Sequence, residues 1–211
     1  MYPKYTLSER IADGCVHFIG IAFGLIGVVW LLLTSFFTLP FFSTLSLVIY
    51  STGLLLMFGF SAAYHLIAIP SWKCLLRRFD QAAIFIKIAG TYTPFTLIKM
   101  GGFYGYGLFS TVWVIAFIGV IAKLYITSGW EKTFILLYLL LGWIGLVVLQ
   151  PLIASVPALT LALLILGGVF YSVGIIFHLW ETLFFQNVIW HIFVLAGTIC
   201  HFGAVVTAIF E

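Results

Sequence analysis

The sequence predicts an all-α membrane protein, a bundle of seven transmembrane helices in one domain that covers residues 1–211. The first observation is composition: 64% of the residues are hydrophobic and only 7% are charged, whereas soluble domains carry about 25% charged residues. So few charges cannot cover a water-facing surface, and the surface must therefore face lipid. The second observation is a series of seven apolar runs, each close to the roughly 20 residues that a helix needs to cross the hydrocarbon core.

The breaks between the apolar runs set the bounds of the expected spans. They carry turn residues or charges, as at Pro40 and around Pro157. Before the first span, Thr6-Leu-Ser-Glu9 fits a capping box and predicts a short helical lead-in. The first run is longer than the signal-peptide core of about 7–15 residues, so we expect no cleaved signal. The spans are expected at about residues 15–37, 44–67, 80–98, 104–126, 133–151, 158–180 and 188–210.

The distribution of lysine and arginine predicts the orientation of the bundle. Cytoplasmic loops of membrane proteins carry an excess of these residues. If the N-terminus is inside, the outside segments hold only Lys99, and the inside segments hold Lys4, Arg10, Lys73, Arg77, Arg78, Lys123 and Lys132. We therefore expect a multi-pass protein of the plasma or inner membrane with a cytoplasmic N-terminus and a C-terminus outside. This orientation argues against a G-protein-coupled receptor, and the net charge of +3 without a dense basic patch argues against nucleic-acid binding.

Ionisable side chains in the spans are the candidates for function, because each costs about 2.5–3.5 kcal/mol at the centre of a bilayer. Three of them share one depth: His65 at the end of span two, Asp80 at the start of span three and His191 in the first turn of span seven. They are expected within about 5 Å of one plane, and His178 at the inner end of span six shares that level. Imidazoles and a carboxylate that converge in a partly dry place suit zinc or a similar ion.

Each of these residues also has a structural interpretation. A single histidine near a helix end is commonly an interfacial or hydrogen-bonded residue. Asp80 follows Arg77 and Arg78, so it can cap its helix and pair with one of them. Lys87 lies two turns beyond Asp80 and is expected to snorkel or to pair with it.

Two further histidines are expected to pack or to make polar contacts between helices, away from this level. They are His17 in the first span and His201 in the last. His201 is ten residues past His191, about 15 Å along the helix, so it cannot join the same site.

These residues occur in recognisable contexts. Ser61-Ala-Ala-Tyr-His65, Phe79-Asp80-Gln-Ala-Ala-Ile, Ala89-Gly-Thr-Tyr-Thr-Pro94 and Ile189-Trp-His191-Ile-Phe-Val-Leu-Ala-Gly follow one another, ending at His201-Phe202. The chain thereby resembles the hemolysin III branch of the progestin and adipoQ receptor (PAQR) family, in its bacterial form, over nearly its whole length. The resemblance implies seven helices, a cytoplasmic N-terminus and a zinc site near the inner face.

The resemblance also implies roles for particular residues. His65 would be the first zinc ligand and His191 the second histidine of an HxxxH pair. Asp80 would hold a zinc-bound water, and Ser61 would orient the imidazole or that water. The first histidine of the pair should fall at position 187, where this chain has Asn187, and an amide oxygen is a poor zinc ligand.

Three outcomes remain open for this incomplete ligand set. Asp80 binds the metal directly, His178 swings in as the third ligand, or the site is weak or empty. The expected cofactor is zinc.

The likeness to alkaline ceramidases and adiponectin receptors implies a zinc-dependent hydrolysis of a lipid amide, with Asp80 as the general base. The expected ligand is a membrane lipid, either ceramide-like or a free fatty acid, whose chain enters from the bilayer. One alternative is a non-enzymatic, receptor-like or membrane-homeostasis protein with a structural metal site. Another is a cytolysin-type protein that permeabilises membranes, although no span carries a continuous polar stripe.

Overall fold

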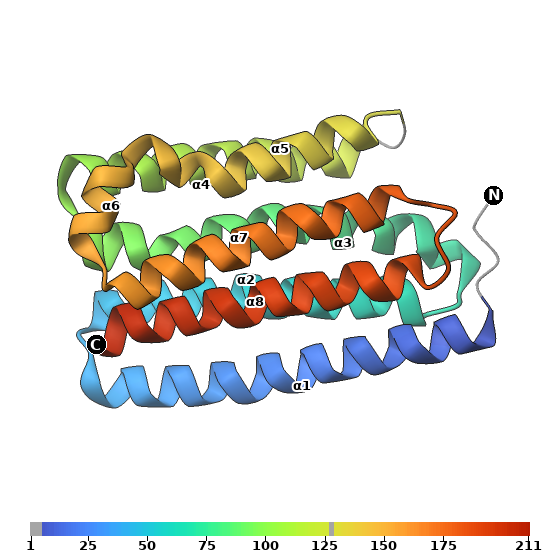
Figure 1. Ribbon diagram of the computed structural model, residues 1–211, viewed down its shortest axis with the longest axis horizontal. Coiled ribbons are helices and arrows are strands. Elements are labelled where there is room, and N and C mark those ends of the chain that lie inside the picture. Colours follow the sequence, from blue (N-terminus) through green and yellow to red (C-terminus); the bar gives the residue numbers. More distant parts are fainter. Residues whose placement is uncertain (1–5, 127–128) are drawn as a thin grey trace.

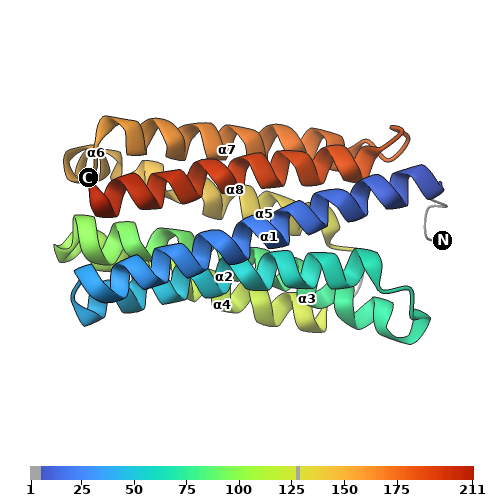
Figure 2. The same cartoon turned by 90° about the horizontal axis from the view of Figure 1, so that it is seen from below.

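The computed structural model describes residues 6–126 and 129–211, and within them every regular element is helical. Long helices run up and down in alternation, so α1 begins at one end of the bundle and α8 finishes at the other (Figures 1 and 2). The helices are α1 (Leu7–Thr38), α2 (Phe41–Leu66), α3 (Pro70–Pro94), α4 (Gly102–Tyr125), α5 (Glu131–Trp143), α6 (Leu149–Ser155), α7 (Ala158–Leu179) and α8 (Gln186–Phe210). A π-helical turn, Phe95–Met100, extends α3, and a 3-10 segment, Ile144–Val148, joins α5 to α6.

Six helical segments among the described residues are long and apolar enough to cross a membrane. They are α1, α2, α4, the continuous segment Glu131–Ser155, α7 and α8. The chain is therefore a multi-pass integral membrane protein. The remaining expected span, residues 80–98, falls in α3 and its π-helical extension. Charged residues are more frequent in α3, which includes Arg77, Asp80 and Lys87.

The N-terminus of α1 is fixed by the capping box that the sequence predicts. The Thr6 hydroxyl accepts from the Glu9 N–H (3.3 Å), and the Glu9 carboxylate accepts from the Thr6 N–H (2.9 Å). The same carboxylate also accepts from the main-chain N–H of Phe185 (3.0 Å), just before α8 begins. In Figure 2, α1 crosses the bundle obliquely, so that its start lies against the start of α8. This contact brings Asp13, one turn after Glu9, next to His191 in α8.

The interface between α2 and α3 is close because a glycine lies at the point of contact. A Cβ atom at Gly53 would lie 2.9 Å from the carbonyl oxygen of Ile86 in α3, so only glycine permits this separation of the two backbones. The close packing contributes to the burial of Lys87, the residue after Ile86, which is 4% exposed. It also fixes the position of α2, whose last turns carry Ser61 and His65.

Candidate metal centre

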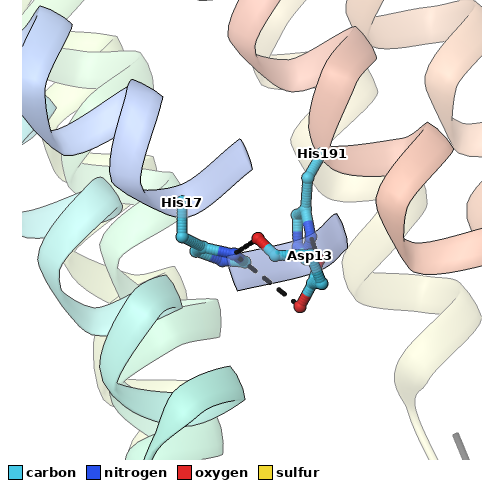
Figure 3. Close-up of side chains that lie close together, drawn as sticks. All are labelled: Asp13, His17 and His191. Atoms are coloured by element: carbon cyan, nitrogen blue, oxygen red, sulfur yellow. Dashed lines mark hydrogen bonds and ion pairs between the residues drawn. The ribbon is translucent and has the colours of Figure 1, made fainter. Parts of the chain in front are cut away.

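The Asp13 carboxylate is the centre of a cluster of histidines drawn from three helices. Its Oδ1 lies 2.6 Å from Nδ1 of His191 in α8, and its Oδ2 lies 3.3 Å from Nδ1 of His65 in α2. His17, one turn further along α1, has its Nδ1 3.7 Å from Oδ2 and 2.8 Å from the main-chain oxygen of Asp13. Figure 3 shows Asp13 and His17, both from α1, meeting His191 from α8.

The three imidazole rings also pack directly against one another. The ring centroids of His17 and His191 are 4.5 Å apart, those of His65 and His191 are 4.6 Å apart, and those of His17 and His65 are 5.2 Å apart. Nε2 of His17 hydrogen-bonds to the hydroxyl of Ser61 (3.2 Å). Asp13, His17 and His191 are less than 9% exposed, so each polar group relies on the others for its partners.

The donor chemistry of the cluster fits a transition-metal ion. Asp13, His17 and His191 each offer one ligand atom, and these atoms lie within 4.8 Å of one another. Two imidazoles and one carboxylate form a ligand set that catalytic zinc uses, with a further position open to water or substrate. His65 stands beside this group with its Nδ1 directed at the same carboxylate. The cluster can therefore hold a metal ion.

The carboxylate predicted for the site, Asp80, lies nearby on α3 without belonging to this group. It is close enough to Ser61 and His65 to interact with both. The arginines before it bind elsewhere: Arg77 forms an ion pair with Glu131 (2.6 Å), and Arg78 donates to a main-chain oxygen of α4. The roles assigned to Asp80 and Ser61 stay predictions, and the observed hydrogen bond of Ser61 is to His17.

The other two candidate ligands, His178 and Asn187, lie at the same end of the bundle. His178 is in the last turn of α7, with its ring 5.0 Å from that of Trp190. Its Nδ1 is buried and has no hydrogen-bond partner in residues 6–126 and 129–211. Asn187 is one turn before His191 in α8. Neither residue belongs to the group of Asp13, His17 and His191, and their predicted roles as ligands stay predictions.

Two functional candidates were not assigned to the site by sequence reasoning. Asp13 belongs to the polar lead-in. His17 was expected to pack or to make a polar contact between helices, which its hydrogen bond to Ser61 of α2 confirms, but away from the level of His65, which is wrong. Asp13 was overlooked because α1 begins at Leu7, well before the expected span at residue 15. His17 lies in the first turn of that expected span, so the expected bounds already placed it near the inner end of the bundle. The signal was present: residues spaced i, i+4 share one helix face.

The expected contacts of Lys87 and His201 have different outcomes. Lys87 forms no ion pair with Asp80, because its ammonium lies over the ring of Tyr171, 5.1 Å from the centroid. His201 makes the expected polar contact between helices, with Nε2 3.2 Å from the main-chain oxygen of Leu164 in α7.

One large cavity of about 1870 Å³ is lined by the histidine cluster and by the other candidate residues of the site. At one end it is lined by the histidine cluster, and it continues between α3, α7 and α8 past Lys87 toward Met100 and Leu161. The site residues that line it are Asp13, His17, Ser61, His65, Asp80, His178, Asn187 and His191. The cluster can therefore be reached from inside the bundle.

Comparisons with known proteins agree with the motifs. The family model described as "Haemolysin-III related" matches residues 5–202. "Hemolysin-3 homolog" of Bacillus subtilis (strain 168) is 35% identical over 201 residues, covering 95% of this chain and 94% of the relative. "Hemolysin-3" of Bacillus cereus is 34% identical over 199 residues, covering 94% and 91%. No solved structure matches. The chain belongs to the haemolysin-III related family, the hemolysin III branch of the PAQR proteins.

Proposed function

We propose that this protein is a membrane-embedded, zinc-dependent hydrolase of a lipid amide. The observation that supports it best is the buried Asp13 carboxylate, which interacts with three imidazoles at the end of a cavity of about 1870 Å³. His17, His191 and Asp13 would hold the ion, with His65 as a further donor. Zinc in this place supplies a Lewis acid for the substrate carbonyl.

The side chains of the site suit the remaining chemistry. Water adds to the amide carbonyl, the C–N bond breaks, and the proton lost by the water passes to the leaving nitrogen. Asp80 lies beside Ser61 and His65 on the cavity wall and carries that proton as general base and then general acid. Leu146 and Ile165, each about half exposed, line the cavity between the α5–α6 segment and α7, where an acyl chain can enter from lipid.

Metal content and turnover, measured on the same purified protein, test this proposal. We expect about one zinc per chain by elemental analysis and hydrolysis of a ceramide analogue. His191→Ala should lose both, whereas Asp80→Asn should keep the zinc and lose turnover. A zinc-loaded protein that leaves a panel of lipid amides intact, while a ceramidase control cleaves them, contradicts the hydrolase.

A non-enzymatic metal site is the second candidate, and the side chain at position 187 favours it. An asparagine stands where the resemblance expects an imidazole, and a reduced ligand set supports turnover less well. If the metal site is structural, Asp80→Asn should leave the zinc content and the turnover assay unchanged and should alter only the stability of the protein.

Membrane permeabilisation is favoured by the names of the relatives alone, "Hemolysin-3 homolog" and "Hemolysin-3". Dye-filled liposomes that contain the purified protein test it directly. Release of dye above that of protein-free liposomes supports lysis, and retention argues against it.

The proposal includes seven spans, with α3 as the third, and a cytoplasmic N-terminus. Basic residues support this orientation, because Lys73, Arg77, Lys123 and Lys132 all lie at the end of the bundle where α1 begins. A C-terminal alkaline phosphatase fusion should be active outside the cell, and a C-terminal green fluorescent protein should stay dark. The opposite pattern overturns the orientation.

A further inference from the structure

A second polar region lies deeper in the same cavity, around Lys87 of α3. Lys87 is seven residues beyond Asp80, about 10 Å further along the helix. Its side chain is 4% exposed, and its Nζ lies 5.1 Å from the centroid of the Tyr171 ring of α7. His201 of α8 lies close enough to interact electrostatically with Lys87. All three side chains line the cavity.

Within residues 6–126 and 129–211, the Lys87 ammonium has no counter-charge. In the two described stretches of the chain, no carboxylate lies within ion-pair distance of it and no side chain or carbonyl accepts a hydrogen bond from it. The cation–π contact with Tyr171 leaves its three N–H donors unused. Buried charges in proteins are normally paired, and a lysine at depth in a membrane marks a functional site by default.

The hydroxyls of Thr91, Tyr171 and Thr198 around Lys87 already have hydrogen-bond partners. The Thr91 hydroxyl donates to the main-chain oxygen of Lys87 (2.8 Å). Thr198 donates to a carbonyl of its own helix, so the Tyr171 hydroxyl must donate to Thr198 (2.7 Å). Nε2 of His201 donates to a carbonyl of α7 (3.2 Å), so Nδ1 of the neutral ring, which has no partner among the described residues, can only accept. The ammonium is the donor that remains available to a ligand.

We propose that Lys87 binds the monoanionic head group of a single-chain amphiphile, such as a long-chain carboxylate. One buried positive charge is neutralised by one negative charge, and the attraction is strong where water is excluded. From Lys87 to Thr96 the cavity runs along α3 for about 14 Å, with Ile88, Phe95 and Leu161 among its lining residues. That stretch accepts the chain. The site is separate from the proposed hydrolytic centre, and its existence does not require turnover.

Equilibrium binding of radiolabelled palmitate to the purified full-length protein tests this site. Wild type should bind palmitate, and Lys87→Met should bind it at least tenfold more weakly. Lys87→Arg keeps the charge and should retain most of the affinity. Lys99→Met is the matched control, because Lys99 is also on the α3 segment but does not line the cavity, and it should bind like wild type.

Competition on wild type identifies what Lys87 recognises and requires no variant to fold. Unlabelled palmitate should displace the label, whereas hexadecanol and hexadecyltrimethylammonium, which carry the same chain, should compete at least tenfold less well. Acetate should not compete. Equal competition by hexadecanol shows an apolar cavity alone, and equal competition by acetate shows a site for small anions; either result overturns the proposal. Unchanged palmitate affinity in Lys87→Met also overturns it.

Discussion

The two polar regions of the cavity differ in whether the chain itself supplies partners for the buried ionisable group. At one end, the Asp13 carboxylate has three imidazoles around it, each supplied by the chain itself. Around Lys87, the neighbouring hydroxyls and Nε2 of His201 bond to other groups, and no carboxylate of the described residues lies within ion-pair distance of the ammonium. Burial of a polar group alone therefore does not indicate a ligand. Converging donors indicate a cation, and an unpaired ammonium indicates an anion.

Removal of Asp13 should have the largest effect on stability, because three imidazoles lose the carboxylate that they share. Asp13→Ala leaves the imidazoles without their shared partner, and each buried polar group left unsatisfied costs about 1–3 kcal/mol. The melting temperature in detergent should fall sharply and bound zinc should be lost. Asp13→Asn keeps the shape of the side chain and an acceptor oxygen, so its melting temperature and zinc content should lie between those of wild type and Asp13→Ala. A stable, zinc-loaded Asp13→Ala variant would refute the central place of this carboxylate.

Added zinc should have the next largest effect. Binding to the folded state alone stabilises it by about 2.7 kcal/mol at a hundred times the dissociation constant. Thermal unfolding of metal-stripped protein should therefore shift upward with Zn²⁺ but not with Mg²⁺, which prefers oxygen ligands. His191→Ala should abolish the shift. The same upward shift with both metals would mean that the cluster does not select a transition metal.

Gly53→Ala should disturb both regions at once, because α2 carries His65 and α3 carries Lys87. The new Cβ atom would meet the Ile86 carbonyl oxygen at 2.9 Å, and overpacking of this kind costs about 1–3 kcal/mol. Gly59→Ala, in the same helix, is the matched control, because a Cβ atom there meets nothing within 4 Å. Thermal unfolding of both variants checks the expectation. Equal melting temperatures would show that the close contact is not required.

Lys87→Met should have the smallest effect on stability, and in the opposite direction. It replaces a buried charge by an apolar side chain of similar length, which removes the desolvation cost of that charge. The melting temperature without ligand should therefore be at least that of wild type, with Lys99→Met as the reference. A clear loss of stability would show that the ammonium already has a partner inside the bundle.

The sequence predicted the membrane class because composition alone excludes a water-facing surface. It also predicted that His65 and His191 lie at one depth, since both were placed from the ends of long apolar runs. Asp13 was missed because its helix begins before the apolar run does. The capping box at Thr6 and Glu9 marked that earlier start, but it was interpreted only as a lead-in. The Tyr171 contact of Lys87 depends on which helices are neighbours, and single-sequence periodicity does not give this.

The hydrogen bond from Phe185 to Glu9 joins positions 176 residues apart. It has a consequence for biosynthesis. The ribosome delivers His191 178 residues after Asp13. During translation the Asp13 carboxylate is therefore in the membrane before its closest partner, His191, has been made. A chain interrupted before residue 186 therefore carries an unfinished centre, and quality-control proteases can recognise that exposed polarity.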